Sequence, residues 1–303
     1  MNKDKTILKT LLLGSFFASL SAMLGGSTFV FTRYVVDSID PFTLSFLRYG
    51  LTGLILFLLS ISVYMNKKFA KADLIPMCFL GLAMITLFPN FMALGLEHTT
   101  AARAGLLYAT MPLCTIIIAY FFNIEKITLN KSLAVLLAIL GVSFCMSERV
   151  DNNFQDTLKG DFLMMIGVLS ASCFTVFSGK YLKKYGNIPV MIFVILIGTI
   201  LNLIISMIFG NSIISLLEIN KFEAAALLML IIPGGVVMMY CWGKALQLIS
   251  PTQAAISLGF NPLTAILLGS IILNEEITFK LGVGFISILM AIMLANLKSK
   301  IKA

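Results

Sequence analysis

Long apolar runs alternate with short polar connections along the whole chain, and this pattern predicts membrane-spanning helices. A helical span needs about 20 apolar residues to cross a bilayer. The longest connections, 147–159 and 211–223, leave no room for a soluble domain. The predicted spans are 10–31, 43–64, 74–95, 100–122, 130–147, 161–180, 189–210, 224–246, 252–273 and 280–298.

The second half of the chain repeats the pattern of the first at an offset of 150 residues. Pro112 falls on Pro262, and Glu125 falls on Glu275. A fixed period of this kind indicates duplication of one structural unit. We therefore predict an all-α polytopic membrane protein with ten transmembrane helices in two five-helix repeats, residues 1–147 and 160–303, joined by a linker at 148–159. Because five is an odd number, the second repeat is expected to be inverted.

Composition agrees with a membrane protein. The chain is 59% hydrophobic and 12% charged, with a mean hydropathy of +1.00, whereas soluble domains average about 25% charged residues. The formal charge of +8 does not indicate nucleic-acid binding, because the basic residues lie in short clusters between apolar runs. That distribution is typical of positively charged cytoplasmic loops.

The distribution of Lys and Arg predicts the orientation. With the N-terminus inside, 15 lysines lie on the inner side and five basic residues on the outer side, so both termini are expected to be cytoplasmic. The N-terminal stretch resembles a signal peptide. We interpret it as the first span, because its removal would leave the first repeat one helix short.

Motifs for catalysis or metal binding are missing from the sequence. The five cysteines form no C-x-x-C pair, and the single histidine, His98, lies in a predicted outer loop. We therefore expect no cofactor and no metal, and we interpret the cysteines as small packing residues. Glu125 and Glu275 stand at the ends of spans, where Glu-x-x-Thr patterns cap helices, so a structural role is favoured for both.

Taken in order, several short elements resemble the EamA-type branch of the drug/metabolite transporter superfamily. The resemblance covers essentially the whole chain and departs from the family at Gly25, where tryptophan is common, and at Glu276, where a basic residue is common. The matching elements are Gly25-Gly26-Ser27-Thr28-Phe29, Leu47-Arg48-Tyr49 after Pro41, Pro112 with Glu125-Lys126-Ile127-Thr128 and Gly141-Val142, and Pro262 with Glu275-Glu276-Ile277-Thr278 and Gly282.

Matched interruptions of the helices predict where the solute binds. Pro112 and Pro262 each leave a carbonyl without its helical donor, and paired interruptions in two repeats are typical of a transporter binding site. The alternative is a tolerated kink. Asn90 and Asn261 adjoin prolines and are expected to contact either the solute or a neighbouring helix.

Two arginines lie within spans. Arg48 and Arg103 have no acidic counterpart at their depth in the sequence pattern, so they are expected to favour an anionic or zwitterionic solute. The alternatives are extension to the outer surface, a structural or gating role, or pairing with Glu97 or Asp40. Because no Asp or Glu lies in the middle third of a span, we predict facilitated diffusion or exchange without tight proton coupling.

Thr28 and Tyr108 complete the predicted solute path, together with Arg48, Arg103, Asn90, Pro112, Asn261 and Pro262. Trp242, the only tryptophan, and the nearby Tyr240 are interpreted as anchors at the membrane surface.

These features favour a secondary transporter of a small polar metabolite that works by alternating access. The resemblance implies an amino acid or a related compound, export, and a bacterial inner membrane; import of a cofactor-like or nucleoside-like solute is the alternative. A polytopic membrane enzyme would need grouped titratable residues, which the sequence lacks. A scaffold or sensor is disfavoured because there is no soluble domain. The expected partners are the solute and the lipid bilayer, and nucleic acid is excluded.

Overall fold

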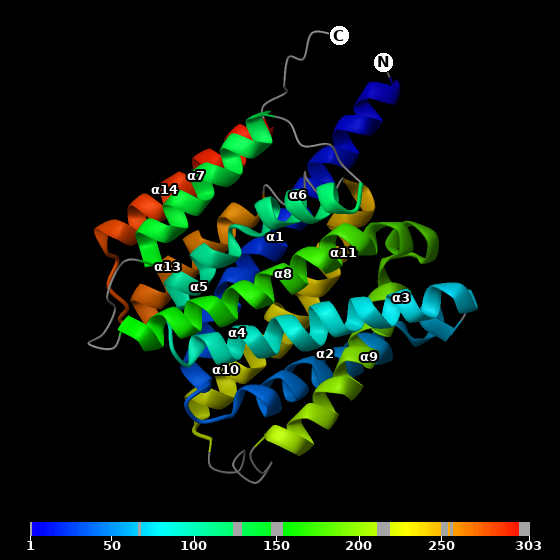
Figure 1. Ribbon diagram of the computed structural model, residues 1–303. Coiled ribbons are helices and arrows are strands. Elements are labelled where there is room, and N and C mark those ends of the chain that lie inside the picture. Colours follow the sequence, from blue (N-terminus) through cyan, green and yellow to red (C-terminus); the bar gives the residue numbers. More distant parts are fainter. Residues whose placement is uncertain are drawn as a thin grey trace.

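The computed structural model describes residues 2–65, 68–123, 129–146, 154–210, 219–249, 254 and 257–296. All regular elements in these ranges are helical (Figure 1). Seven helices are long and apolar enough to cross a membrane, and shorter apolar helices accompany them. The prediction of an all-α polytopic membrane protein is therefore confirmed, while the number of ten spans and the inversion stay predictions.

The first half begins with two long helices, and π-helical or turn segments then interrupt the third and fourth predicted spans. Its elements are α1 (Asn2–Val35), α2 (Pro41–Met65), α3 (Lys71–Gly81), the π-helical η1 (Leu82–Leu87), α4 (Phe88–Leu96), α5 (Ala101–Tyr108), α6 (Met111–Phe121) and α7 (Leu129–Met146).

The second half follows the same order, with interruptions in the corresponding places. Its elements are α8 (Phe154–Tyr185), α9 (Asn187–Phe209), α10 (Lys221–Ile231), the π-helical η3 (Ile232–Val237), α11 (Met238–Leu248), the 3₁₀ turn η4 (Ser257–Gly259), α13 (Phe260–Ile272) and α14 (Phe279–Asn296).

Irregular backbone recurs at the repeat offset. The two π-helical segments, η1 and η3, begin at residues 82 and 232 and end at 87 and 237, and both differences equal 150. Asn123 and Asn274 adopt left-handed φ angles of 56° and 55° at matching turns. Because π-helical segments are rare and locally determined, their recurrence supports a duplicated unit.

Packing between the halves shows the same symmetry. Helix α7 runs along α14, and α2 packs against α9 (Figure 1). Helix α1 packs against α11 and α13, while its counterpart α8 packs against α4 and α6. When each helix is replaced by its counterpart in the other half, the contacts of α1 with α11 and α13 become those of α8 with α4 and α6. The pairs α7–α14 and α2–α9 map onto themselves.

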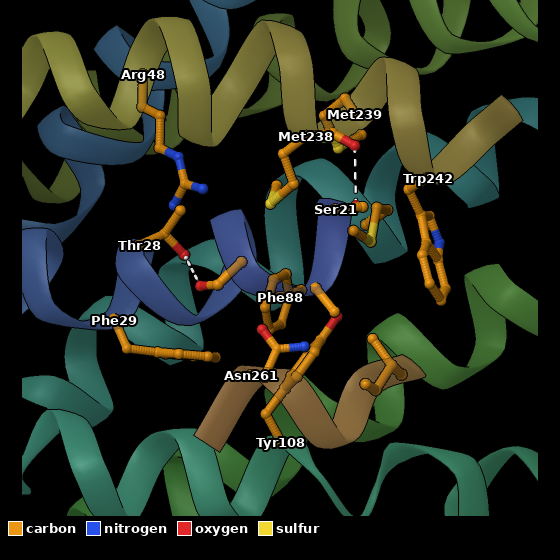
Figure 2. Close-up of a pocket in the computed structure, with 14 residues that line it drawn as sticks. Ser21, Thr28, Phe29, Arg48, Phe88, Tyr108, Met238, Met239, Trp242 and Asn261 are labelled. Carbon is orange, nitrogen blue, oxygen red and sulfur yellow. Dashed lines mark hydrogen bonds between the residues drawn. The ribbon is translucent and has the colours of Figure 1, made fainter. Parts of the chain in front are cut away.

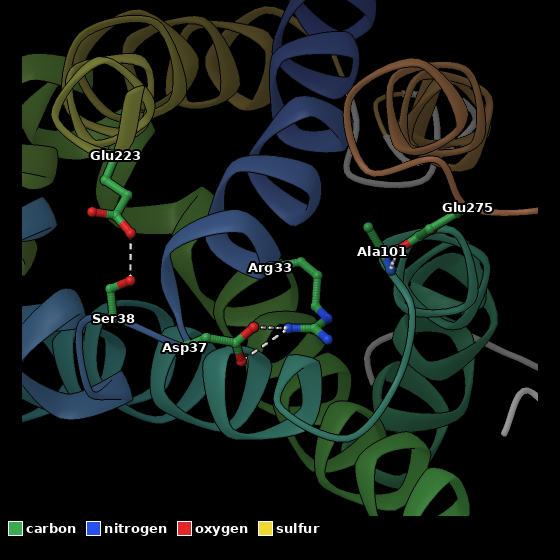
Figure 3. Close-up of polar contacts among 6 residues, drawn as sticks. All are labelled: Arg33, Asp37, Ser38, Ala101, Glu223 and Glu275. Carbon is green, nitrogen blue, oxygen red and sulfur yellow. Dashed lines mark hydrogen bonds and ion pairs between the residues drawn. The ribbon is translucent and has the colours of Figure 1, made fainter. Parts of the chain in front are cut away.

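Polar contacts at the helix ends follow this exchange. Asp73, in the first turn of α3, accepts hydrogen bonds from Lys184 and Tyr185 at the end of α8. Glu223, 150 positions after Asp73, accepts one from Ser38 just after α1 (Figure 3). Carboxylates at equivalent positions of the two repeats thus hold equivalent helix ends.

Candidate functional site

A cavity lies between the two halves, with walls from α1, α2, η1, α4 and α5 on one side and α11, η4 and α13 on the other (Figure 2). Its volume that is open to the centre of a water molecule is about 30 Å³. One water needs roughly 10–15 Å³ measured in this way. The cavity therefore has room for only a few waters, and a metabolite would enter only after its walls move apart.

Among the described residues of the cavity wall, Arg48 is the only charged one. It lies two turns into α2, is 2% exposed, and donates through Nη2 to the carbonyl of Gly234 in η3 at 3.0 Å. Its Nε is buried without a hydrogen-bond partner, and among the described residues no carboxylate forms an ion pair with it. A buried guanidinium in this state favours the arrival of an anion.

Asn261 offers the opposite polar group. It is 1% exposed, and both Oδ1 and Nδ2 lack a partner. Its amide reaches into the cavity from α13, across from Arg48 (Figure 2). Leaving such a group unsatisfied costs about 1–3 kcal/mol, so a solute that pairs with it regains that free energy.

Glycines in α1 allow Asn261 to sit this close. A Cβ at Gly25 would stand 2.6 Å from Oδ1 of Asn261, and one at Gly26 would stand 2.4 Å from its carbonyl oxygen. The departure from the family pattern at Gly25 therefore creates the space that the amide of Asn261 now borders.

Aromatic rings form the wall around this amide. Tyr108 packs between Phe29 and Phe88, with ring centroids 5.5 and 5.3 Å apart, and Trp242 lies at the other end of the cavity (Figure 2). Trp242 is 4% exposed, so the prediction that it is a surface anchor is wrong. Its indole lines the cavity from α11.

Of the predicted site residues, Thr28, Arg48, Tyr108 and Asn261 line the cavity. Thr28 donates its hydroxyl to the carbonyl of Gly25 at 2.7 Å. The sequence analysis missed the remaining wall, because apolar side chains in a membrane helix carry no signal that separates a cavity from a packed core. The missed residues are Ser21, Ala22, Gly25, Phe29, Met84, Phe88, Met238, Met239, Trp242 and Leu258.

The prolines stand beside the cavity at interruptions of the chain. Helix α5 ends at Tyr108 and α6 begins at Met111, so Pro112 lies in the first turn of α6. Pro262 lies in the first turn of α13, directly after η4. A proline is tolerated there, because the first turn of a helix needs no backbone donor.

Asn90 belongs to a contact between helices and does not line the cavity. Its Nδ2 donates to the carbonyl of Thr86 at 2.8 Å and to Oδ1 of Asn202 at 2.9 Å. Asn202 in turn donates to the carbonyl of Ile85, which lies four residues before Pro89, a residue without a backbone N–H. The helix–helix alternative for Asn90 therefore agrees with these contacts.

Arg103 has an acidic partner, so the prediction that none lies at its depth is wrong. It forms an ion pair with Asp161, whose Oδ1 also accepts a hydrogen bond from Thr99 at 2.8 Å. Asp161 is fully buried. The sequence pattern missed this pair because α8 begins at Phe154, seven residues before the predicted span, and so carries Asp161 two turns into the helix.

A second hollow, of about 730 Å³ open to the centre of a water molecule, lies among loops that we predicted to face outward, and Arg103 lines this hollow. Here Glu275 accepts hydrogen bonds from the backbone N–H groups of Ala101 and Ala102 at 2.8 and 3.1 Å (Figure 3). It therefore caps α5, a helix of the other repeat. Burial raises the pKa of Glu97, another carboxyl group in this hollow.

A helix cap by Glu275 agrees with the structural role that we predicted for it. The equivalent Glu125 lies outside the described residues.

Comparison with known proteins identifies the family. The model of the EamA-like transporter family matches residues 12–147 and 158–297. This chain belongs to the EamA-like transporter family. The two matched segments correspond to the two halves described above, and the protein is accordingly a multi-pass membrane transporter of a small-molecule solute.

Relatives of this EamA-like transporter cover nearly the whole chain. An uncharacterized transporter of Archaeoglobus fulgidus is 26% identical over 285 residues, which cover 92% of this chain and 96% of the relative. The uncharacterized transporter YrdR of Bacillus subtilis is 23% identical over 300 residues, with 95% and 92% covered. A solved crystal structure, 17% identical, matches with a TM-score of 0.69 and covers 94% of this chain and 96% of the other.

Proposed function

We propose that this EamA-like transporter moves a small metabolite that carries a carboxylate, an amino acid or a related compound, by alternating access. The observation that carries the proposal is Arg48, a buried guanidinium with an unpartnered Nε at the wall of a cavity between the repeats. A guanidinium binds a carboxylate specifically, through paired N–H···O bonds.

The size of the cavity supports the alternating-access part of this proposal. Because the space is smaller than a metabolite, the two halves must separate on one side to admit the solute and on the other to release it. Close helix contacts mark where such a movement would begin. A Cβ at Gly105 of α5 would stand 2.7 Å from that of Ala265 in α13, so these helices meet with almost no intervening side chain.

The buried carboxylate does not change the prediction of facilitated diffusion or exchange. Among the described residues no Asp or Glu lines the cavity, and Asp161 is held by Arg103 and Thr99. Proton-coupled transporters commonly use an acidic or histidine side chain inside the membrane as the proton carrier. We therefore propose that the gradient of the solute drives its own movement.

Several features of this proposal come from the sequence pattern and the resemblance. They are export as the direction, a bacterial inner membrane, cytoplasmic termini, and two inverted five-helix repeats.

Transport assays with purified protein in liposomes test the proposal. A panel of labelled amino acids, other carboxylates, neutral metabolites and permanent cations is offered with and without a pH gradient. We expect flux of carboxylate-bearing solutes, with little accumulation driven by the pH gradient. Flux restricted to cations or neutral solutes would contradict the carboxylate proposal, and uptake that collapses with a protonophore would contradict the absence of proton coupling.

A further inference from the structure

The cavity has two polar ends of different chemistry, and this difference narrows the class of solute. One end is the guanidinium of Arg48 on α2, and the other is the amide of Asn261 on α13 (Figure 2). The rest of the wall is mainly apolar and aromatic, and Ser21 and Thr28 add two hydroxyl groups. A solute that satisfies both groups therefore needs an anionic group for Arg48, a second polar group for Asn261 and an apolar part for the rest of the wall.

A monoanion would satisfy only the first end. Its carboxylate would occupy Arg48, and both amide atoms of Asn261 would remain buried without partners, as they are now. The cost of that arrangement is the desolvation of an unpaired donor and acceptor.

The surroundings of Asn261 fit a cationic donor. The Oδ1 of its amide accepts hydrogen bonds, and Phe29, Phe88 and Tyr108 lie around it in the same wall. The face of an aromatic ring attracts an ammonium group. The Oδ1 of Asn261, beside these aromatic rings, can therefore hold an ammonium group. No carboxylate lies in the described cavity wall, so nothing there would bind a metal or neutralise Arg48.

We propose that Asn261 determines specificity by accepting a hydrogen bond from the ammonium group of a zwitterionic solute whose carboxylate is bound by Arg48. This inference rests on the proposed function and narrows it to an α-amino acid with an apolar side chain. Gly25 belongs to the same site, because any side chain at this position would clash with Oδ1 of Asn261.

Binding to the purified full-length protein in lipid nanodiscs tests the assignment with three probes. They are leucine, 4-methylpentanoate, which lacks the ammonium group, and leucinamide, which lacks the carboxylate. Wild type should bind leucine at least about tenfold more tightly than 4-methylpentanoate, since a hydrogen bond from a charged donor is worth about a factor of ten or more.

Substitutions then assign each end of the probe. Asn261→Leu should weaken the binding of leucine by about tenfold and leave the binding of 4-methylpentanoate nearly unchanged. Thr264→Val, a polar-to-apolar change one turn along α13 and outside the cavity wall, should change neither. If Asn261→Leu does not fold, Gly25→Ala provides the second variant and should cause the same selective loss.

Two results would overturn the inference. Equal binding of leucine and 4-methylpentanoate to wild type would do so, as would an equal loss for both in Asn261→Leu. Failure of the proposed function looks different, because Arg48→Gln would then leave the affinities of leucine and 4-methylpentanoate unchanged, or neither probe would bind to wild type.

Discussion

The ion pair between Arg103 and Asp161 indicates a structural role for Arg103, in contrast to the solute-binding role that we propose for Arg48. Both side chains are buried, and they join α5 to α8. Arg103 borders the second hollow, and neither residue lines the central cavity. We predict that Arg103→Gln and Asp161→Asn each destabilise the fold, because each leaves the partner's charge buried and unpaired.

The magnitude follows from the burial of the pair. Removal of one member of a buried ion pair costs about 3–5 kcal/mol. Loss of the hydrogen bond from Thr99 to Asp161 in Thr99→Val should cost a further ~1 kcal/mol. The double variant Arg103→Gln, Asp161→Asn should cost clearly less than the sum of the two single variants, because neither charge then remains.

Unfolding in mixed micelles by added SDS measures these differences. Trp242 is the only tryptophan of the chain and is buried, so its fluorescence reports the loss of the core. Arg33→Gln is the control, because Arg33 forms a surface ion pair with Asp37 and such pairs contribute about 0–1 kcal/mol.

One pattern would refute this reasoning. If Arg103→Gln unfolds like the Arg33→Gln control while transport of carboxylate solutes is lost, Arg103 acts on the solute and not on the fold. Additive effects of the single variants would also contradict the pairing.

Three further predictions concern packing, the helix interruption and topology. Gly198→Ala should destabilise by several kcal/mol, since its Cβ would stand 2.3 Å from a side-chain carbon of η1, whereas Gly179→Ala, with nothing within 4 Å, should be neutral in the same SDS titration. Pro262→Ala should reduce transport more than stability, because it lets the helix continue through η4 and moves the neighbouring cavity wall; unchanged kinetics would make this proline a tolerated kink. In a background without native cysteines, Asn123→Cys and Glu276→Cys should react with an impermeant thiol reagent from opposite sides of the membrane, and labelling from the same side would contradict the inverted repeat.

The fold could be predicted from the sequence because a helix that crosses the bilayer needs an apolar run of a fixed length. The duplication also shows each element twice. The matched prolines indicated the two interruptions, whose positions the structure confirms at Ala109–Thr110 and Ser257–Gly259. The π-helical segments were not predictable, since in η1 no proline or glycine marks the change.

The candidate site was only partly predictable. Arg48 and Asn261 stand out in the sequence because polar groups are costly in a membrane, but the cavity that joins them depends on how two distant helices pack. Arg103 looks the same as Arg48 in the sequence, because both are arginines within apolar spans. The structure distinguishes them: α8 begins early enough to place Asp161 beside Arg103. The inward position of Trp242 depends on how α11 packs against the other helices, which no local pattern encodes.

The most direct test of the central claim is the rate of exchange of a carboxylate solute in liposomes that contain Arg48→Gln. Glutamine keeps a donor for the carbonyl of Gly234 and removes the positive charge. Thr52→Val is the matched control, because Thr52, one turn along α2, donates to the carbonyl of Ile231 and lies outside the cavity wall. We predict that Arg48→Gln abolishes exchange while its SDS unfolding stays like that of Thr52→Val, which exchanges normally. Exchange at the wild-type rate in Arg48→Gln would contradict the role of Arg48 in binding the solute.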